Sequence, residues 1–312
     1  MIYSVTLNPA IDRIIHVHDA LTRGKNNHVS ESYNDIGGKG THVSVVLSCL
    51  DTPNIATGFI GENGKEELYS LLMERKVNPE FFVLPNRAVR QNYVIMDETH
   101  SGSFMITQTG PSITPDELEQ FTTDFTGKLE PDDIVVFAGN PSRLMSPNDY
   151  GSLLKKVKET GVRLIVDASG DYLKKAIEIA PTLIKPNQYE FGELTQKKIT
   201  SIEDTIEVME KSNLSKIDYI IVSLGKKGSL LFHNGSIDHV IPPKVKTVND
   251  TGCGDAFVGG IVYALYKNFS VEDMLTFATS VSASKAMQPT SSGFVPEEAR
   301  LLREQVTLEK IK

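Results

Sequence analysis

The sequence has few cysteines and no long apolar segment. Cys49 and Cys253 are its only cysteines, too few for a disulfide framework and without the paired spacing of a metal site. No stretch reaches the ~18 consecutive apolar residues of a membrane-spanning helix, and the N-terminus lacks the basic and apolar regions of a signal peptide. These absences predict a cytoplasmic protein in a reducing compartment, with no membrane partner.

The chain also lacks an excess of positive charge. Its 32 Lys and Arg residues against 40 Asp and Glu residues give a formal net charge of -8. Such a charge disfavours a broad phosphate-binding surface, so no nucleic-acid partner is expected. With 40% hydrophobic and 23% charged residues, the composition is that of an ordinary globular protein.

Short apolar runs alternate with segments of helical period along the chain. The first half contains such segments at 3–7, 41–50, 55–60 and 65–76. A strand, helix, strand, helix, strand series follows at 133–139, 151–160, 162–169, 172–180 and 218–225. This order predicts one doubly wound α/β domain whose mainly parallel sheet is covered on both faces.

Four short β-like pieces break that rhythm, at 12–18, 28–34, 91–97 and 103–107. No helix separates the members of each pair, and such pieces usually pair antiparallel. They are expected to form either a small sheet apart from the main one or extra edge strands of the main sheet. The pattern alone leaves both arrangements open.

The segment "NDTGCGDAF" at 249–257 combines glycines and aspartates with the start of a helix. Apolar residues then recur at helical spacing, at Phe257, Val258, Ile261, Val262 and Leu265. The helix is therefore expected to start at or just after Gly254. The N–H groups of residues 252–255 would lie at its N-terminus, where unpaired donors and the helix dipole favour an anion.

Asp255 is the candidate general base of this corner. Beside a phosphoryl group, its carboxylate can accept the proton of an attacking hydroxyl group. The alternative is that Asp255 and Asp250 only cap a turn and a helix. Cys253 is a weaker candidate nucleophile, because the sequence shows no histidine-centred constellation as its base, and a small side chain between two glycines is the favoured role.

Two further segments carry candidate phosphate and metal ligands. "DIGGKGTHVSVV" at 35–46 is a glycine-rich entry into a helix but not a Walker A loop, and its Lys39 is expected to meet a phosphate. In "LIKPNQYEFGEL" at 183–194, Asn187 and Glu190 share one helix face. They suit a hydrated Mg²⁺, or they form a capping box.

Four segments in this order resemble the ribokinase-type (PfkB) carbohydrate kinase family: "TLNPAID" (6–12), "GGKG" (37–40), "KPNQYE" (185–190) and "DTGCGDAF" (250–257). The first is further similar to the branch that contains 1-phosphofructokinases and tagatose-6-phosphate kinases. The resemblance implies a single ribokinase-like domain over 1–312, with lid inserts at approximately 10–36 and 88–108. It also implies transfer of the γ-phosphoryl group of ATP to a hydroxyl group of a ketohexose phosphate, and a homodimer through the antiparallel lid.

The resemblance implies a role for each matching residue. Asp255 is the implied base, with Gly252, Cys253 and Gly254 as the anion hole. Asn187 and Glu190 organise Mg²⁺ through water. The implied nucleotide-binding residues are Asn187, Ser223, Gly225, Gly228, Gly252 and Gly254, in part from the turn "SLGKKG". The implied substrate-binding residues are Asp12, Gly37, Gly38, Lys39, His42, Arg90 and Asn140.

Arg90 in "RQN" resembles the family's substrate-phosphate arginine, since a guanidinium fork suits a phosphate that is bound but not transferred. The nearby Arg87 is an alternative for this task. His42 stands where the branch usually carries asparagine, and Asn140 where it carries serine. Both positions border the sugar in relatives, so these departures concern the substrate rather than phosphoryl transfer.

The leading hypothesis is an ATP-dependent kinase of fructose 1-phosphate or tagatose 6-phosphate. A kinase of an unphosphorylated sugar or nucleoside is the alternative within enzymes. Arg90 and Lys39 favour a phosphorylated substrate, because a neutral sugar would leave both cations without a counter-charge. A non-catalytic sugar-phosphate sensor is the alternative outside enzymes, and it has no need of a base such as Asp255.

Overall fold

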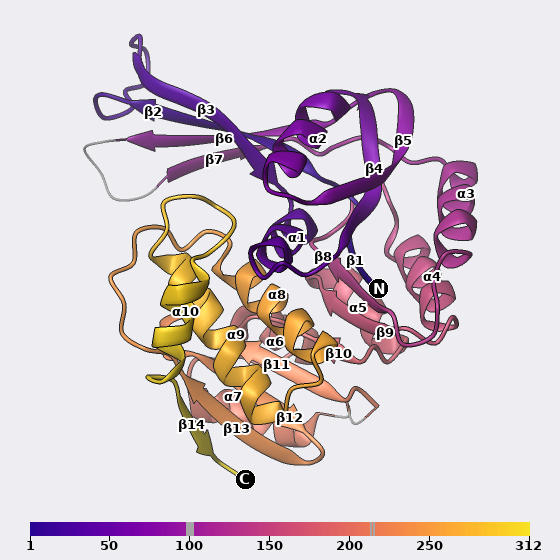
Figure 1. Ribbon diagram of the computed structural model, residues 1–312, viewed down its shortest axis with the longest axis vertical. Coiled ribbons are helices and arrows are strands. Elements are labelled where there is room, and N and C mark those ends of the chain that lie inside the picture. Colours follow the sequence, from indigo (N-terminus) through magenta and orange to yellow (C-terminus); the bar gives the residue numbers. More distant parts are fainter. Residues whose placement is uncertain (98–102, 213, 215) are drawn as a thin grey trace.

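The computed structural model describes residues 1–97, 103–212, 214 and 216–312 (Figure 1). Its strands are β1 (Ile2–Thr6), β2 (Ala10–Val17), β3 (Val29–Gly37), β4 (Ile55–Asn63), β5 (Asn78–Ala88), β6 (Arg90–Asp97), β7 (Ser103–Thr107), β8 (Ile134–Ala138), β9 (Arg163–Asp167), β10 (Leu183–Ile184), β11 (Tyr219–Ser223), β12 (Ser229–His233), β13 (Ser236–Ile241) and β14 (Thr307–Lys310). Its helices are α1 (Lys39–Cys49), α2 (Lys65–Glu74), α3 (Pro115–Thr126), α4 (Pro147–Lys158), α5 (Gly170–Glu178), α6 (Gln188–Thr195), α7 (Ile202–Lys211), α8 (Cys253–Tyr266), α9 (Val271–Ala286) and α10 (Pro296–Arg303), with a 3-10 turn η1 (Gly225–Lys227).

The main sheet has ten strands in the order β14-β13-β12-β11-β10-β9-β8-β1-β4-β5. All neighbours from β11 to β5 pair parallel, whereas β12, β13 and β14 form an antiparallel edge. The predicted doubly wound, mainly parallel sheet is therefore confirmed. Among the helices of the described residues, none is long and apolar enough to cross a membrane.

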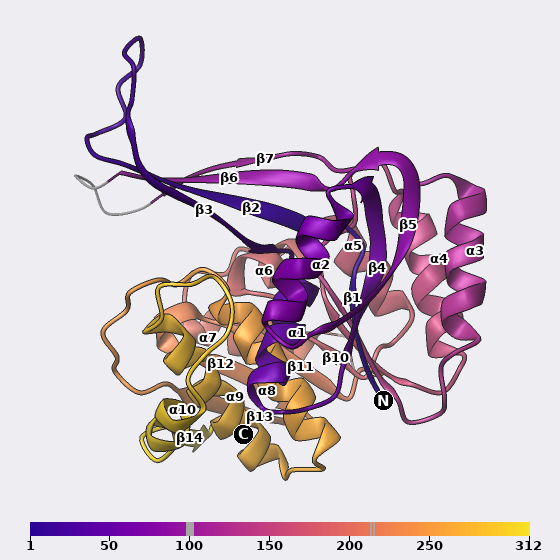
Figure 2. The ribbon, with the colours of Figure 1, turned by 45° about the horizontal axis from the view of Figure 1, so that its top comes forward.

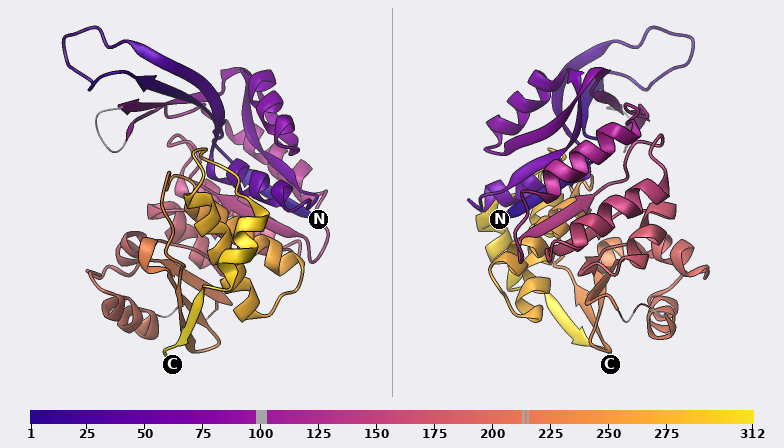
Figure 3. Two further views of the ribbon diagram at one scale, coloured as in Figure 1. Left: turned by 60° about the vertical axis from the view of Figure 1, so that its left-hand side comes forward. Right: turned by 90° about the vertical axis from the view of Figure 1, so that its right-hand side faces the viewer.

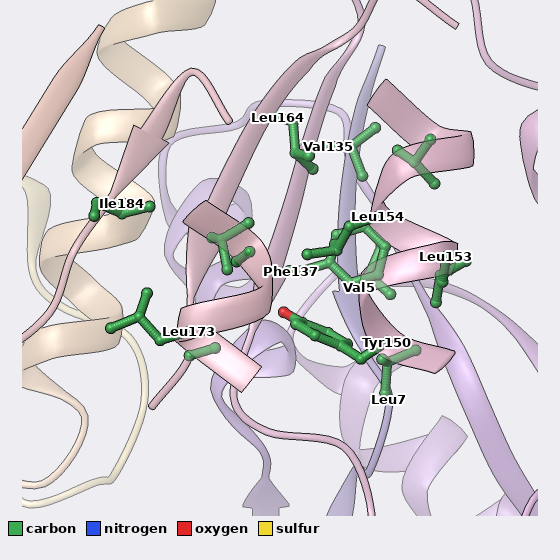
Figure 4. Close-up of a cluster of buried hydrophobic side chains, with 14 of the residues drawn as sticks. Val5, Leu7, Val135, Phe137, Tyr150, Leu153, Leu154, Leu164, Leu173 and Ile184 are labelled. Carbon is green, nitrogen blue, oxygen red and sulfur yellow. The ribbon is translucent and has the colours of Figure 1, made fainter. Parts of the chain in front are cut away.

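Strand β8 shows why these apolar runs form buried strands. Its Val135 and Phe137 belong to the cluster under α3 to α7, where Figure 4 shows Phe137 near Tyr150. Its Ile134 and Val136 belong to the opposite cluster, which contains residues of α1, α8 and α9. A strand covered by helices on both faces reads as a continuous apolar run, as this one does.

The four β-like pieces form a second sheet, here called the lid sheet, in the order β3-β2-β6-β7. Figures 2 and 3 show it projecting from the body of the molecule. The pairs β2/β3 and β6/β7 are antiparallel as predicted, and the alternative of extra edge strands in the main sheet is wrong. β2 and β6 pair parallel, because each follows a strand of the parallel main sheet and leaves it at the same edge.

Candidate active site

The candidate site residues gather where the parallel strands of the main sheet end. β9 ends at Asp167, β10 is followed by Lys185, and β11 ends at Ser223. The N-termini of α1 and α8 lie at the same edge, since Lys39 of α1 contacts Asp167 and Gly254 of α8 adjoins Lys185. Open α/β sheets bind their ligands at this edge.

Residues 249–255, here called the α8 corner, form the turn into α8. Gly252 caps the helix with a φ of 81°, and a Cβ atom there would lie 1.9 Å from the carbonyl oxygen of Ser291. Only glycine fits this position. The helix begins at Cys253, one residue before the predicted start. Burial raises the pKa of the Cys253 thiol, which does not favour the nucleophile alternative.

The α8 corner presents unpaired backbone donors. The N–H group of Cys253 donates to the carbonyl oxygen of Asp250 at 3.3 Å, so this donor is already engaged in the turn. In the described part of the chain, the N–H groups of Gly254 and Asp255 have no hydrogen-bond partner. Together with the helix dipole they can hold an anion.

Asp255 is buried and paired with a histidine. Oδ2 of Asp255 lies 2.7 Å from Nδ1 of His42, and Nε2 of His42 lies 2.9 Å from the carbonyl oxygen of Ile36. Only an imidazolium can donate to both acceptors. Burial opposes the charged ring, but the hydrogen bond and charge of Asp255, with smaller contributions from Ile36 and Asp12, raise the pKa of His42 to about 9.

Asp12 forms a second buried carboxylate near His42. Its Oδ1 accepts a hydrogen bond from Nδ2 of Asn92 at 2.7 Å, across the parallel pairing of β2 and β6. Burial raises the pKa of Asp12, against the opposing charge of His42. Gly37 allows this placement, because a Cβ atom on it would lie 2.1 Å from Oδ1 of Asp12. Gly38 follows with a φ of 113° and caps α1.

Arg90 and Arg87 differ in their surroundings. Arg87 donates to Oε1 of Glu117 at 2.7 Å, so its guanidinium is already paired. Arg90 forms no ion pair with the described residues, and its Nε is buried without a hydrogen-bond partner. Burial lowers the pKa of Arg90, against the charge of Asp12. Arg90 is therefore the arginine that is free to grip an anion.

Two lysines converge on one buried carboxylate. Nζ of Lys39 lies 3.4 Å from Oδ2 of Asp167, and Nζ of Lys185 lies 3.6 Å from Oδ1. The negative charge of Asp167 raises the pKa of Lys39, whereas burial alone acts to lower it. A Cβ atom on Gly254 would lie 3.7 Å from Nζ of Lys185. Sequence reasoning missed Lys185, although it is the first residue of "KPNQYE".

Asn140 is engaged with the neighbouring loop. Its Nδ2 donates to Oγ of Ser169 and its Oδ1 accepts from the Ser169 N–H group, both at 2.9 Å. These bonds tie the end of β8 to the start of α5. The role of Asn140 in substrate binding remains a prediction.

Asn187 and Glu190 form a capping box at the start of α6. The Glu190 N–H group donates to Oδ1 of Asn187, and the Asn187 N–H group donates to Oε2 of Glu190, both at 2.8 Å. The capping interpretation is therefore confirmed. In the described part of the chain, no cluster of three histidine, cysteine or acidic side chains could hold a metal ion directly. Oε1 of Glu190 has no hydrogen-bond partner among those residues, and its contact with Mg²⁺ through water stays a prediction.

The turn after β11 lies beside this capping box. The Ser223 N–H group donates to the carbonyl oxygen of Pro186 at 3.0 Å, which joins the two strand ends. Gly228 has a φ of 93°, and a Cβ atom there would lie 1.8 Å from the carbonyl oxygen of Val240. Gly225 also has a positive φ, with open space around it. Gly228 thus allows close packing of this turn against Val240, while Gly225 leaves open space in the turn beside α6.

Comparison of the chain with known proteins identifies its family and several relatives. The model of the family described as pfkB family carbohydrate kinase matches residues 5–297. The chain is 32% identical over 287 residues to a 1-phosphofructokinase of Bacillus subtilis, with 92% of each chain covered. It is 30% identical over 291 residues to a tagatose-6-phosphate kinase of Staphylococcus epidermidis, with 92% of this chain and 93% of that one covered.

A solved structure agrees over a similar extent. Phosphofructokinase-2 of Escherichia coli in complex with potassium superimposes with a TM-score of 0.90 at 25% identity. The match covers 97% of this chain and 98% of that chain. The arrangement of a main sheet with a smaller second sheet is thus shared with a solved structure.

Proposed function

Because this chain belongs to the pfkB family of carbohydrate kinases, we propose that it transfers the γ-phosphoryl group of ATP to a hydroxyl group of a ketohexose phosphate. It is a phosphotransferase with an alcohol group as acceptor. The observation that carries the proposed chemistry is the buried Asp255 carboxylate beside the unpaired N–H groups of the α8 corner. Fructose 1-phosphate and tagatose 6-phosphate are the proposed acceptors, by analogy with the two relatives.

Asp255 is the proposed general base. Its Oδ2 is held by His42, which leaves Oδ1 for the attacking hydroxyl group. As the new O–P bond forms, the hydroxyl proton moves to Asp255, and the bond between the γ-phosphorus and the bridging oxygen of the leaving ADP breaks. The N–H groups of Gly254 and Asp255 stabilise the charge on the transferred group.

The lysines and the capping box serve the phosphate groups of the two substrates, with Lys39 kept as a residue of the sugar-phosphate side, although Asp167 already gives it a counter-charge. Lys39 and Lys185 bring two positive charges to the edge where the phosphates bind, and Asp167 holds both. Asn187 and Glu190 would hold Mg²⁺ through water, and the ion would supply charge neutralisation at the phosphates. Ser223, Gly225 and Gly228 are the proposed wall of the nucleotide pocket, next to α6.

Arg90 supports a substrate that already carries a phosphate. Arg90 is half-buried, and its Nε is buried without a hydrogen-bond partner. It forms no ion pair among the described residues, so an anion such as a spectator phosphate would compensate its charge. Asp12 and Asn92 present a carboxylate and an amide from adjacent lid strands to the sugar hydroxyl groups. Gly37, Gly38 and Asn140 complete the proposed sugar site, and His42, whose two ring nitrogens are engaged by Asp255 and Ile36, acts on it through Asp255.

We also propose a homodimer through the lid sheet. β7 exposes Phe104, Met105 and Ile106 at 55%, 52% and 59% of their surface. An apolar strand of this kind is suited to packing against a second copy of the chain. Light scattering coupled to size exclusion, with Ile106→Lys as the variant, tests the dimer. A wild-type monomer contradicts it.

A coupled assay of ADP release across sugars tests the function. Fructose 1-phosphate, tagatose 6-phosphate, fructose 6-phosphate and the unphosphorylated sugars are compared at equal concentration. A ketohexose phosphate is expected to give the highest kcat/KM. Asp255→Asn is the matched control, and it should lower kcat by ~10²- to 10⁴-fold while ATP still binds.

The same assay separates the alternatives. Turnover of unphosphorylated sugars or nucleosides above that of all sugar phosphates would replace the proposal with the sugar or nucleoside kinase. Binding of a sugar phosphate without any turnover would replace it with the sensor. Near wild-type kcat in Asp255→Asn would remove Asp255 from the role of base.

A further inference from the structure

Lys285 is a fully buried lysine that the proposed chemistry does not use. It lies near the end of α9 with 0% of its surface exposed. Placing an ammonium group out of contact with water is costly unless nearby groups compensate its charge. Burial accordingly lowers the pKa of Lys285, while the nearby acidic groups favour its charged form. The position of this charge therefore calls for an explanation.

The ammonium group of Lys285 reaches the first residue of the α8 corner. Its Nζ donates to the carbonyl oxygen of Asn249 at 3.1 Å. The side chain of Asn249 in turn accepts from the Thr251 N–H group and donates to the carbonyl oxygen of Pro289, both at 2.9 Å. Lys285 thus holds Asn249, whose side chain stabilises the α8 corner through its hydrogen bonds.

The stem of Lys285 passes directly behind the helix cap. A Cβ atom on Gly252 would lie 3.6 Å from Cε of Lys285. The negative groups that face the ammonium are Cys253 when ionised, Asp250 and Asp255 of the α8 corner, and Asp35 of the lid sheet. The positive charge consequently lies beside the 249–252 turn, which leads into the unpaired N–H groups of Gly254 and Asp255.

We propose that Lys285 is a built-in cation of the α8 corner, which holds the 249–252 turn in shape and adds positive potential behind the anion-binding N–H groups. The inference rests on the proposed function, and Lys285 acts as a positioning residue, since it touches neither substrate. A tethered ammonium cannot dissociate. The corner therefore needs no free monovalent cation for the charge that Lys285 supplies.

Lys285→Met tests the charge with little change in volume. If the charge of Lys285 supports the corner, the kcat of Lys285→Met should be lower than that of the wild type by ~10- to 100-fold. The variant removes a buried charge but also leaves the carbonyl oxygen of Asn249 without its donor, so these two effects oppose each other and the Tm should change little. The matched control is Lys267→Met, an exposed lysine at the far end of α8, with unchanged kcat. An unchanged kcat in Lys285→Met, or a loss that only follows a lower Tm, overturns the inference.

Rescue of activity by added cations shows whether Lys285 acts through its charge or only through its packing. Wild-type activity should be equal in potassium, sodium and tetramethylammonium chloride at constant ionic strength. Lys285→Ala opens space beside the Asn249 carbonyl oxygen, and its lost activity should return in part with potassium or ammonium but not with tetramethylammonium. A wild type that needs potassium, or an alanine variant that no small cation rescues, contradicts the built-in cation.

A binding readout keeps this test independent of the sugar. Isothermal calorimetry with ATP and Mg²⁺ needs no turnover, and Lys285→Met should weaken ATP binding several-fold relative to Lys267→Met. A wild type that turns over no sugar phosphate would refute the proposed function while this comparison still decides on Lys285. Equal ATP dissociation constants for the two variants overturn the inference.

Discussion

His42 bridges the N-terminal regions of α1 and α8, with Nδ1 at 2.7 Å from Oδ2 of Asp255 and Nε2 at 2.9 Å from the carbonyl oxygen of Ile36. Because both neighbours are acceptors, the ring is held as an imidazolium. The proposed base is thus oriented by a residue 213 positions away.

The first prediction concerns pH and stability. The pKa of His42 is raised from 6.5 to about 9 in the folded chain. The contribution of the pair is therefore fully present below pH 6.5 and is lost as pH rises through 9. The difference in free energy of unfolding between wild type and His42→Asn should be on the order of 3 kcal/mol near pH 6 and shrink toward pH 9.5. Urea unfolding measures it.

The control for this prediction is His28→Asn. His28 is exposed, so this variant should track the wild type at every pH. A stability difference for His42→Asn that stays constant from pH 6 to 9.5 would show that His42 is neutral in the folded chain.

Local sequence signals predicted much of this fold. The apolar run of β8 indicated a strand buried on both faces, and the glycines and helical period around Gly252 placed the α8 corner within one residue. Each of these features depends on residues that are neighbours along the chain. The same holds for the Asn187 and Glu190 capping box, three residues apart.

Contacts between distant segments could not be predicted in this way. His42 was expected to border the sugar, and nothing in its own segment indicated the bond to Asp255. The choice between Arg87 and Arg90 stayed open, because Glu117, which pairs with Arg87, lies 30 residues further on. Lys185 gains its place only because β9 and β10 are adjacent in the sheet.

The second prediction contrasts two glycines of the α8 corner. A Cβ atom on Gly254 meets only Nζ of Lys185, at an ordinary 3.7 Å. Gly254→Ala should therefore fold normally, while its methyl group next to the unpaired N–H groups displaces the phosphoryl group and lowers kcat by about 100-fold. Steady-state kinetics and thermal unfolding measure the two effects.

Gly252→Ala is the matched variant with the opposite profile. Its Cβ atom would clash with the Ser291 backbone at 1.9 Å, so this variant should lose at least about 2 kcal/mol of stability. Equal kcat for Gly254→Ala and wild type would show that the phosphoryl group does not bind at this corner.

The third prediction separates metal binding from capping at Glu190. Glutamine also completes a capping box, so Glu190→Gln should keep α6 and change stability by less than about 0.5 kcal/mol. The loss of charge should raise the Mg²⁺ concentration for half-maximal activity roughly fivefold, as a loss of about 1 kcal/mol implies. Glu193→Gln, an exposed position on the same helix, is the control. Identical Mg²⁺ titrations would leave Glu190 with the capping role alone.

The fourth prediction tests whether the substrate carries a phosphate, through Arg90 and Arg87. Arg90 has a buried Nε without a partner, so removing its guanidinium should not cost stability. Charge-assisted hydrogen bonds to a spectator phosphate contribute roughly 1.5 to 3 kcal/mol each. Arg90→Ala should then raise KM for the sugar phosphate by about ten- to a hundredfold. KM for ATP should stay unchanged.

Arg87→Ala is the control, because Arg87 is paired with Glu117 and such a partly exposed pair contributes about 1 kcal/mol or less. Its KM for the sugar phosphate should remain close to that of the wild type. The loss in Arg90→Ala should also be smaller for an unphosphorylated sugar, since that ligand never made the contact. Equal losses for phosphorylated and unphosphorylated sugars would show that Arg90 supports the lid sheet rather than a phosphate, and would favour the kinase of an unphosphorylated sugar.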